Sequence, residues 1–332
     1  MRTWEIAAPR ELVFREQPDP QPGPEDVLVE IVCSAISPGT ELHAYRTGPT
    51  EMMTSPGYLA AGTVIARGSE VDSVEVGARV RVSAPHASLA LVPADGVTVL
   101  PDAVSFEEGC LTHLAGLGHY ALHAGDYRAG DEVAVVGLGL VGMCSASVAE
   151  LVGARVHGLD VVGSRLGRAS DLGFATYDAT DPAFAEAVSE ASFGGIDVVI
   201  DTSGSWSGAL TAVRVARKGT RISMLGVNRR PPDPEVGAEL FAELLDFPAR
   251  FHYESLRLTG CSFHPRSAVE PSAAWTAERC YRYLLDAMAA GRLDLGPLIT
   301  DRVSPEEVGP MMEALDRGNL DHLAVIVNWR AS

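Results

Sequence analysis

The feature that most constrains the fold is the run DEVAVVGLGLVGMCSASVAEL at residues 131–151. A short apolar segment typical of a buried strand leads directly into Gly137, Gly139 and Gly142, which are spaced as GxGxxG. A glycine- and alanine-rich helical pattern follows, and the next β-like run, ARVHGLD, ends at Asp160. A strand, this turn, a helix and a second strand ending in a carboxylate together predict a dinucleotide-binding βαβ unit.

Each position in this turn has a physical reason. Gly137 allows the tight turn, Gly139 lets the backbone approach a pyrophosphate, and Gly142 lets the helix pack close to the strand. The backbone N–H groups of Leu140 and Val141 at the helix start, together with the helix dipole, would hold the phosphate charge. A glycine-rich turn without a ligand is the structural alternative, but the combination of strand, turn and helix favours a cofactor site.

Asp160 and Arg165 decide which dinucleotide the sequence predicts. A carboxylate at Asp160 accepts hydrogen bonds from the ribose hydroxyls and would repel a 2′-phosphate, so NAD is predicted in preference to NADP. Arg165 follows shortly after and could reach a phosphate, which makes it a further candidate cofactor contact and leaves NADP as the alternative.

The rest of the chain predicts two lobes, which 332 residues can form. The first hundred residues carry short β-like runs such as DVLVEIVCSAIS, AAGTVIARG and ARVRVSA, separated by Pro or Gly, which predict an irregular β-barrel. From about Asp131 strands alternate with helices, which predicts a parallel sheet covered by helices on both faces. The expected fold class is α/β.

Composition excludes several classes of protein. Every apolar run is shorter than the roughly 20 residues of a membrane helix, and the N-terminus lacks the apolar core of a secretory signal. A net charge of −18 argues against a nucleic-acid surface. The five cysteines form no CxxC pair, which argues against a structural zinc site and a disulfide framework. We expect a cytoplasmic protein with a small-molecule substrate and no nucleic-acid or membrane partner.

Three segments resemble the medium-chain dehydrogenase/reductase superfamily: AISPGTELHAYRTG, PGYLAAGTVIARGSEVDSVEVGARVRV and the GLGLVG fingerprint. The resemblance implies a GroES-like β-barrel catalytic domain over 1–118, completed by 273–332, and a Rossmann NAD-binding domain over 119–272. It also implies a homodimer joined through an edge strand, for which LRLTGCSF is the candidate. The SPGTE motif is similar to that of a zinc-lacking branch, which includes bacteriochlorophyllide hydroxyethyl dehydrogenases and natural-product dehydrogenases.

The sequence departs from this family where zinc-dependent members hold their metal. Matched to the family's motifs, Pro38 stands at the cysteine position with Ser37 beside it, and Tyr58 and Leu59 stand at the histidine and glutamate positions. Only His113, at the third ligand position, could bind zinc as expected. Catalytic zinc needs about three protein ligands, so no metal is predicted.

Without zinc, the charge that develops on the substrate oxygen needs hydrogen-bond donors. Tyr58 and His113 occupy vacated ligand positions and are predicted to converge on that oxygen. Thr40 and His43 match the residues through which family members relay the proton to solvent, and are predicted as the exit route. The structural alternative has Tyr58 filling the metal's volume and His113 bonded to backbone.

The nicotinamide end of the cofactor is assigned by resemblance to residues that follow the fourth and fifth strands of the parallel sheet. These are Thr202, Ser203, Gly226 and Val227.

Other polar residues receive structural interpretations. His119 and His123 share a helix face with no visible third ligand, and Glu41 would brace its loop. Glu107 and Glu108 would begin a helix, where the dipole favours negative charge. His86 lies at a strand start and would be on the surface or at a pocket rim.

Three functions follow from these predictions. The first is a zinc-independent, NAD(H)-dependent alcohol dehydrogenase or ketoreductase acting on a secondary alcohol or ketone of a small specialised metabolite. The second is a zinc-free, NADPH-dependent enoyl or quinone reductase, which the carboxylate of Asp160 disfavours. The third is a catalytically inert nucleotide-binding protein, which the retained polar residues disfavour.

Overall fold

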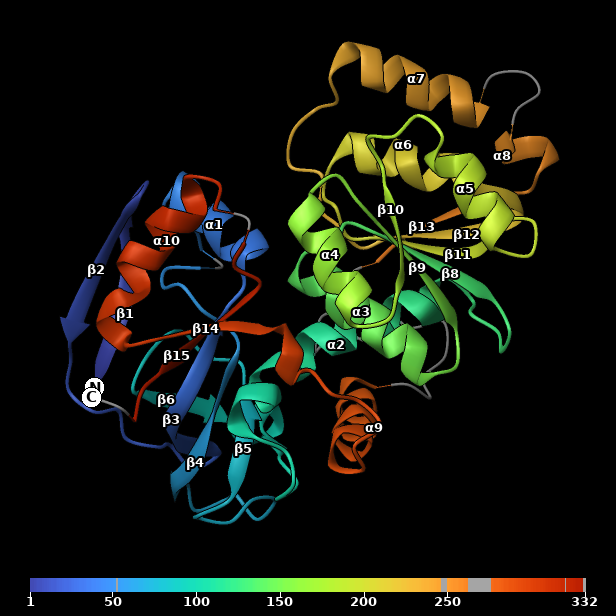
Figure 1. Ribbon diagram of the computed structural model, residues 1–332. Coiled ribbons are helices and arrows are strands. Elements are labelled where there is room, and N and C mark those ends of the chain that lie inside the picture. The colour runs from blue at the N-terminus through green and yellow to red at the C-terminus, as the bar shows by residue number, and fades with distance from the viewer. Residues whose placement is uncertain (52, 246–249, 262–275, 320, 331–332) are drawn as a thin grey trace. The chain divides into compact units, whose positions relative to one another are not determined.

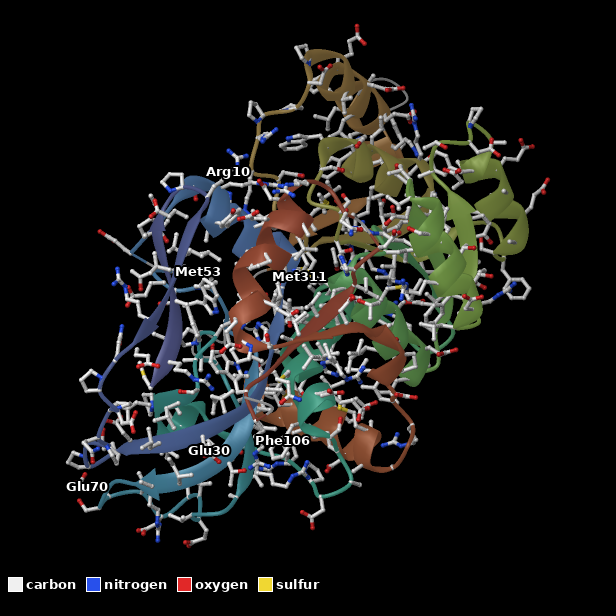
Figure 2. The ribbon with its side chains drawn as sticks, turned by 60° about the vertical axis from the view of Figure 1, so that its left-hand side comes forward. Arg10, Glu30, Met53, Glu70, Phe106 and Met311 are labelled. Carbon is white, nitrogen blue, oxygen red and sulfur yellow. The ribbon has the colours of Figure 1, made fainter. Side chains whose placement is uncertain are left out.

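A computed structural model describes the chain except residues 52, 246–249, 262–275, 320 and 331–332. It divides into two compact units (Figure 1). Unit 1 comprises Met1–His113 and Glu278–Ser332, and unit 2 comprises Leu114–Ala277. The first division falls inside helix α2 (Phe106–Ala124), which begins at Phe106 (labelled in Figure 2). The boundary expected at 272/273 lies outside the described residues.

Unit 1 is built on a seven-stranded sheet of order β14-β15-β3-β4-β5-β7, with β6 also paired to β3. The strands of this sheet are β3 (Asp26–Ile36), β4 (Ala60–Arg67), β5 (Arg79–Val82), β6 (Leu89–Pro93), β7 (Thr98–Val99), β14 (Ile299–Val303) and β15 (Ala324–Asn328). In the same unit β1 (Arg2–Ala8) and β2 (Glu11–Glu16) pair with each other in a separate two-stranded sheet. The other helices of unit 1 are α1 (Pro38–Thr47), α9 (Ala277–Ala289) and α10 (Val308–Asp316), with short 3-10 turns at Ala94–Gly96, Gly296–Leu298 and Pro305–Glu307.

The two chain segments of unit 1 meet in this sheet. The C-terminal strand β15 pairs antiparallel with β3, with Val325 opposite Ile36 and Val327 opposite Ser34. Val325 and Val327 are fully buried in a core that also holds residues of β3, β4 and β5. The predicted irregular barrel is confirmed, since alternating apolar residues and frequent breaks produce short strands that curve around one core.

Unit 2 contains a six-stranded parallel sheet of order β10-β9-β8-β11-β12-β13. Its strands are β8 (Glu132–Val136), β9 (Arg155–Asp160), β10 (Ala175–Asp178), β11 (Ile196–Asp201), β12 (Ala216–Met224) and β13 (Arg257–Gly260). Its helices are α3 (Leu140–Leu151), α4 (Gly163–Asp171), α5 (Phe184–Ala191), α6 (Trp206–Arg214), α7 (Pro234–Leu245) and α8 (Arg250–Tyr253).

The strand order reverses at β8, and the helices follow that reversal. Helices α3 and α4 cover one face of the sheet and α5 and α6 the other, as right-handed crossovers require (Figure 1). All five residues of β8 are buried, as expected for a strand covered on both faces. The predicted doubly wound α/β fold is confirmed.

The segment after β12 leaves the sheet, as its proline-rich start predicted. It forms α7, which lies beside α6, and the short α8 (Figure 1). Neither helix contains a fully buried residue among those described. Across the described part of the chain, no helix is long and apolar enough to span a membrane.

Candidate active site and dinucleotide site

Ser37, directly before α1, is hydrogen-bonded to Tyr58. It is the N-cap residue of α1, yet its hydroxyl makes no capping hydrogen bond to the helix. A serine in this position usually accepts a bond from an N–H group of the first helical turn. Here its Oγ instead accepts a hydrogen bond of 2.6 Å from the Tyr58 hydroxyl. Ser37 is 3% exposed and Tyr58 is partly exposed, so the bond is partly buried.

Gly57 determines where Tyr58 lies. Its φ of +98° is disfavoured for other residues, and a Cβ there would stand 2.5 Å from the backbone nitrogen of His86. The glycine therefore lets the chain pass close to the backbone of His86, so that the Tyr58 side chain reaches Ser37. Tyr58 is partly exposed.

His86 is fully buried, so the prediction that it lies on the surface or at a pocket rim is wrong. Its Nε2 lies 2.9 Å from Glu41 Oε2 and its Nδ1 lies 2.8 Å from Ser34 Oγ. The other oxygen of Glu41 accepts a hydrogen bond of 2.7 Å from the backbone N–H of Ser37. Glu41 thus holds the loop that carries Ser37. The burial of His86 could not be predicted from the sequence, because its hydrogen-bond partners are distant along the chain.

His113 lies on α2 and contacts two aromatic residues. Its Nδ1 is 2.7 Å from the hydroxyl of Tyr281 on α9, a partner that is 168 residues away. Its ring meets that of Tyr58 edge to face, with 5.7 Å between ring centroids. His113 is 9% exposed and Tyr281 3%. The structure therefore brings Tyr58 and His113 together and adds Ser37 and Tyr281 as their hydrogen-bond partners.

The four positions matched to zinc ligands do not suit that metal. Pro38 has no donor atom, and Leu59 is a fully buried hydrocarbon side chain. This leaves an imidazole, His113, and a phenol, Tyr58. Nowhere in the described residues do three or more His, Cys, Asp or Glu side chains form a group that could hold a metal ion. The donor set does not provide the roughly three ligands of catalytic zinc.

Thr40 and His43 lie on α1, and both are exposed. Tyr58 is hydrogen-bonded to Ser37, and His113 to Tyr281. The relay through Thr40 and His43 remains a prediction.

In unit 2 the glycine turn has the geometry that the motif predicts. Gly137 has φ +88°, and a Cβ at Gly142 would stand 1.8 Å from the carbonyl oxygen of Gly137. At Gly139 the nearest atom to such a Cβ is 4.0 Å away, so the backbone is open to a ligand there. Gly139 is the N-cap of α3 and supplies no side chain to its first N–H groups, which include those of Leu140 and Val141. This cradle fits a pyrophosphate.

Asp160 ends β9 beside that turn. Its carboxylate accepts hydrogen bonds from the backbone N–H groups of Leu138 (2.6 Å), Val161 (2.7 Å) and Val162 (2.9 Å). These bonds fix its orientation. Oδ1 accepts two of them and Oδ2 accepts one, so Oδ2 keeps a lone pair for a hydroxyl group. Arg165 Nη1 lies 3.6 Å from Asp160 Oδ2, and the Nε of Arg165 is buried with no hydrogen-bond partner among the described residues.

The predicted nicotinamide contacts follow β11 and β12. Thr202 Oγ1 donates to the carbonyl oxygen of Gly137 at 2.6 Å, which ties this loop to the glycine turn. Ser203 donates its N–H to Asp201, whose pKa is raised by burial. A Cβ at Gly226 would stand 2.4 Å from the nitrogen of Gly204, and Val227 is 62% exposed. The loops after β11 and β12 therefore pack together at the carboxyl ends of their strands.

The structure also places the other polar residues of α2. His119 is buried and its ring centroid is 4.7 Å from that of His123. Glu107 and Glu108 lie in the first turn of α2. Glu107 binds Arg302 through both carboxylate oxygens, and Glu108 accepts a bond from the Ser105 hydroxyl.

Comparisons with known proteins agree with this architecture. The family model described as “Zinc-binding dehydrogenase” matches residues 141–278. “Probable zinc-binding alcohol dehydrogenase Rv1895” of Mycobacterium tuberculosis is 33% identical over 260 residues, which cover 66% of this chain and 66% of that protein, just under two thirds of its length. L-threonine 3-dehydrogenase of Pectobacterium carotovorum subsp. carotovorum is 26% identical over 352 residues, covering 95% of this chain and 94% of that protein.

The fold is also that of a solved dehydrogenase. The crystal structure of 2R,3R-butanediol dehydrogenase from Bacillus subtilis superposes with a TM-score of 0.82 at 17% identity, over 98% of this chain and 99% of that chain. Together with the motifs, the family model and the relatives show that the chain belongs to the medium-chain dehydrogenase/reductase superfamily.

Proposed function

We propose that this chain is an NAD(H)-dependent alcohol dehydrogenase or ketoreductase that interconverts a secondary alcohol and a ketone without zinc. One observation carries the proposal: two protic side chains, Tyr58 and His113, lie ring to ring at positions that zinc-dependent members use for metal ligands. Each is held by its own hydrogen-bond partner, Ser37 or Tyr281. The names of the relatives, alcohol and threonine dehydrogenases, support chemistry at a secondary alcohol.

The side chains provide what the reaction requires of the protein. When bound, the dinucleotide supplies the hydride in reduction and accepts it in oxidation. During reduction, negative charge develops on the carbonyl oxygen, and donors placed in advance stabilise it. Tyr58 and His113 donate hydrogen bonds to this oxygen. In the structure the single O–H proton of Tyr58 is donated to Ser37 Oγ, so this O–H must turn to the substrate oxygen when the ketone binds. Tyr58 then gives its proton to the developing alkoxide. The Ser37 hydroxyl gives its own proton to the Tyr58 phenolate and takes a replacement from solvent.

The zinc-free character can be tested directly, although the matching family is named for zinc. Purified protein should contain far less than one zinc per chain by elemental analysis, and dialysis against EDTA should leave turnover unchanged. With deuterium-labelled NADH and a panel of small ketones, label should appear on the carbinol carbon. A stoichiometric zinc whose removal abolishes turnover would contradict the proposal.

Substitutions separate the chemistry from cofactor binding. Tyr58→Phe should lower kcat by about 100-fold or more, the range typical of a lost acid–base group, with little change in the Kd for NADH. Tyr253→Phe is the matched control, because Tyr253 is an exposed tyrosine of α8 in unit 2. Equal turnover in both variants would refute the role of Tyr58.

NAD is proposed over NADP on the carboxylate of Asp160. Asp160→Ala should weaken NADH binding and reduce the discrimination against NADPH. Asp178→Asn is a matched control, since Asp178 lies opposite Asp160 in the register of β9 and β10 and is exposed. A wild-type protein that binds NADPH more tightly than NADH would reverse the assignment.

One observation favours the second candidate function, an NADPH-dependent enoyl or quinone reductase. The guanidinium of Arg165 lies beside Asp160, and its buried Nε has no partner in the described residues. A 2′-phosphate would satisfy such a group. Arg165→Ala should therefore leave NADH affinity within about threefold if NAD is the cofactor, a change of under 0.7 kcal/mol. A selective loss of NADPH binding would support the alternative.

The substrate class, location and assembly extend the same proposal. The SPGTE wording supports a specialised metabolite as substrate, and the five free cysteines suit the reducing cytoplasm. Homodimerisation is proposed through β13, an edge strand whose residues are all exposed. Leu258→Asp on this strand should convert a dimer to a monomer by light scattering. A wild-type monomer would contradict the dimer.

A further inference from the structure

His113 is hydrogen-bonded to Tyr281, a residue outside the proposed catalytic set. We infer that the Tyr281 hydroxyl donates its proton to His113 Nδ1 and thereby fixes His113 as the neutral tautomer that carries its proton on Nε2. Tyr281 is then a positioning residue, and His113 a hydrogen-bond donor rather than a source of protons.

The geometry commits one nitrogen of the imidazole. Tyr281 Oη and His113 Nδ1 are 2.7 Å apart, which is a hydrogen bond whichever atom donates. The two residues come from α9 and α2, and both are buried. A short, buried bond between two helices holds the ring in one orientation, so Nε2 points away from Tyr281.

Acid–base chemistry decides the direction of that bond. A phenol O–H has an ordinary pKa of about 10, whereas the N–H of a neutral imidazole is a much weaker acid. An imidazole nitrogen is also far more basic than a phenolic oxygen. The stronger pairing therefore has the Tyr281 hydroxyl as donor and Nδ1 as acceptor. The remaining imidazole proton then lies on Nε2.

The neighbours of Tyr281 maintain this state. Burial raises the pKa of Tyr281 to about 12, in spite of the nearby Arg81 charge, so the hydroxyl keeps its proton at neutral pH. The Arg81 guanidinium lies 4.6 Å from the centroid of the Tyr281 ring and the residue is 3% exposed. An arginine side chain only donates, so it cannot take the hydroxyl proton from His113.

The consequence for catalysis rests on the proposed function, whereas the tautomer does not. A neutral imidazole with a proton on Nε2 is a good donor to a developing alkoxide. It is a poor acid, because losing that proton would leave an imidazolate. The proton delivered to the substrate must then come from Tyr58, which is linked to Ser37.

Nuclear magnetic resonance reads the tautomer without substrate or turnover. Protein labelled with ¹⁵N-histidine is examined by long-range ¹H–¹⁵N correlation, which shows which ring nitrogen carries the proton. The His113 signals are those that disappear in His113→Gln. We expect a protonated Nε2 and an unprotonated Nδ1 in the wild type. In Tyr281→Phe the ring remains but the hydroxyl is lost, so both tautomers should appear.

Tyr283→Phe is the matched control, because Tyr283 lies two residues away on α9 and is less buried. It should leave the His113 signals unchanged. Tyr281→Phe should also lower kcat on the order of 10-fold without changing the Kd for NADH, as loss of a partner that orients a functional histidine does. Protonated Nδ1 in the wild type, or identical His113 signals in Tyr281→Phe, would overturn the inference. A tautomer shift in protein that reduces no ketone would uphold it while contradicting the proposed function.

Discussion

At the scale of single residues, the proposed chemistry of unit 1 depends on a serine hydroxyl that binds another side chain instead of capping a helix. Ser37 precedes a helix and would ordinarily cap it, but its hydroxyl serves Tyr58 instead. Pro38 at the next position has no N–H group to satisfy, so less is lost when the cap is absent. The same proline excludes a metal ligand there. A proline at the position matched to a metal ligand thus accompanies a serine hydroxyl that accepts a hydrogen bond from Tyr58 instead of capping α1.

Ser37→Ala tests this route against the relay predicted through Thr40 and His43. If Tyr58 exchanges its proton through Ser37, the variant should lower kcat by about 10-fold or more and leave NADH affinity unchanged, because only a transferring group is lost. Steady-state kinetics with a reducible ketone measures this. Thr40→Ala is made in parallel. A large effect in Thr40→Ala and none in Ser37→Ala would restore the relay through α1.

At the scale of elements, the start of α3 carries two glycines, the N-cap Gly139 and Gly142 in the first turn, which are needed for different physical reasons. A methyl group at Gly142 would overlap the Gly137 carbonyl oxygen, whereas the atom nearest to one at Gly139 would be Arg165 Nη1, 4.0 Å away. Gly142 is therefore required by the fold. We expect Gly139 to be required by the proposed ligand, since its backbone would approach the pyrophosphate.

Two alanine variants should therefore separate folding from binding. Gly142→Ala should lower the thermal midpoint of unfolding by several degrees and abolish NADH binding, because the clash must displace α3 or the turn. Gly139→Ala should leave the midpoint nearly unchanged but weaken NADH by about 10-fold or more, a loss of about 1.4 kcal/mol. Gly167→Ala, at a position on α4 with open space, is the control for both. Normal NADH affinity in Gly139→Ala would contradict the pyrophosphate cradle.

Helix α2 carries a second element-scale effect, in its response to pH. Burial lowers the pKa of His119 to about 4, with a smaller contribution from His123. The unfolded chain binds a proton at pH about 6.5 and the folded chain does not, so stability falls as pH drops from 6.5 to 4. The loss is at most about 3 kcal/mol over this range.

Urea unfolding at pH 7 and pH 4.5 measures this term. In His119→Gln the difference in unfolding free energy between the two pH values should shrink by about 2 kcal/mol, since no imidazole remains to be protonated. His123→Gln is the matched control, because His123 is exposed and lies on the same helix. An unchanged pH dependence in His119→Gln would show that other groups cause the acid destabilisation.

Features that depend on residues close together in the sequence could be predicted, whereas features that depend on distant residues could not. The glycine turn, Asp160 and the strand–helix alternation are local patterns, and the structure agrees with the fold they predict. The family resemblance predicted that Tyr58 and His113 lie close together, because both residues belong to segments that match the motifs of the family. Tyr281 could not be predicted, since it lies on a different helix far along the chain and its surroundings carry no motif. His86 was misassigned for the same reason, as its partners Glu41 and Ser34 come from other elements.

At the scale of the whole molecule, the two units differ in how the chain builds them. Unit 2 is one continuous segment with its own core, which includes Val199 and Ile222. Unit 1 needs both ends of the chain, because β15 lies between β14 and β3 in its sheet. The residues proposed for dinucleotide binding all belong to unit 2, and those proposed for proton transfer all belong to unit 1. Damage to one sheet should therefore affect one function.

Ile326→Asp tests this separation. Ile326 is fully buried on β15, opposite Ala35 of β3 and Arg302 of β14. An unpaired buried carboxylate there should cost about 4 kcal/mol or more, enough to disrupt the sheet of unit 1. Ketone reduction should be lost, while NADH titrated by fluorescence should still bind within about threefold of the wild-type Kd, a change of under 0.7 kcal/mol. Ile326→Val, which keeps the position apolar, should retain both. Loss of NADH binding in parallel with turnover would show that unit 2 depends on unit 1 for its fold.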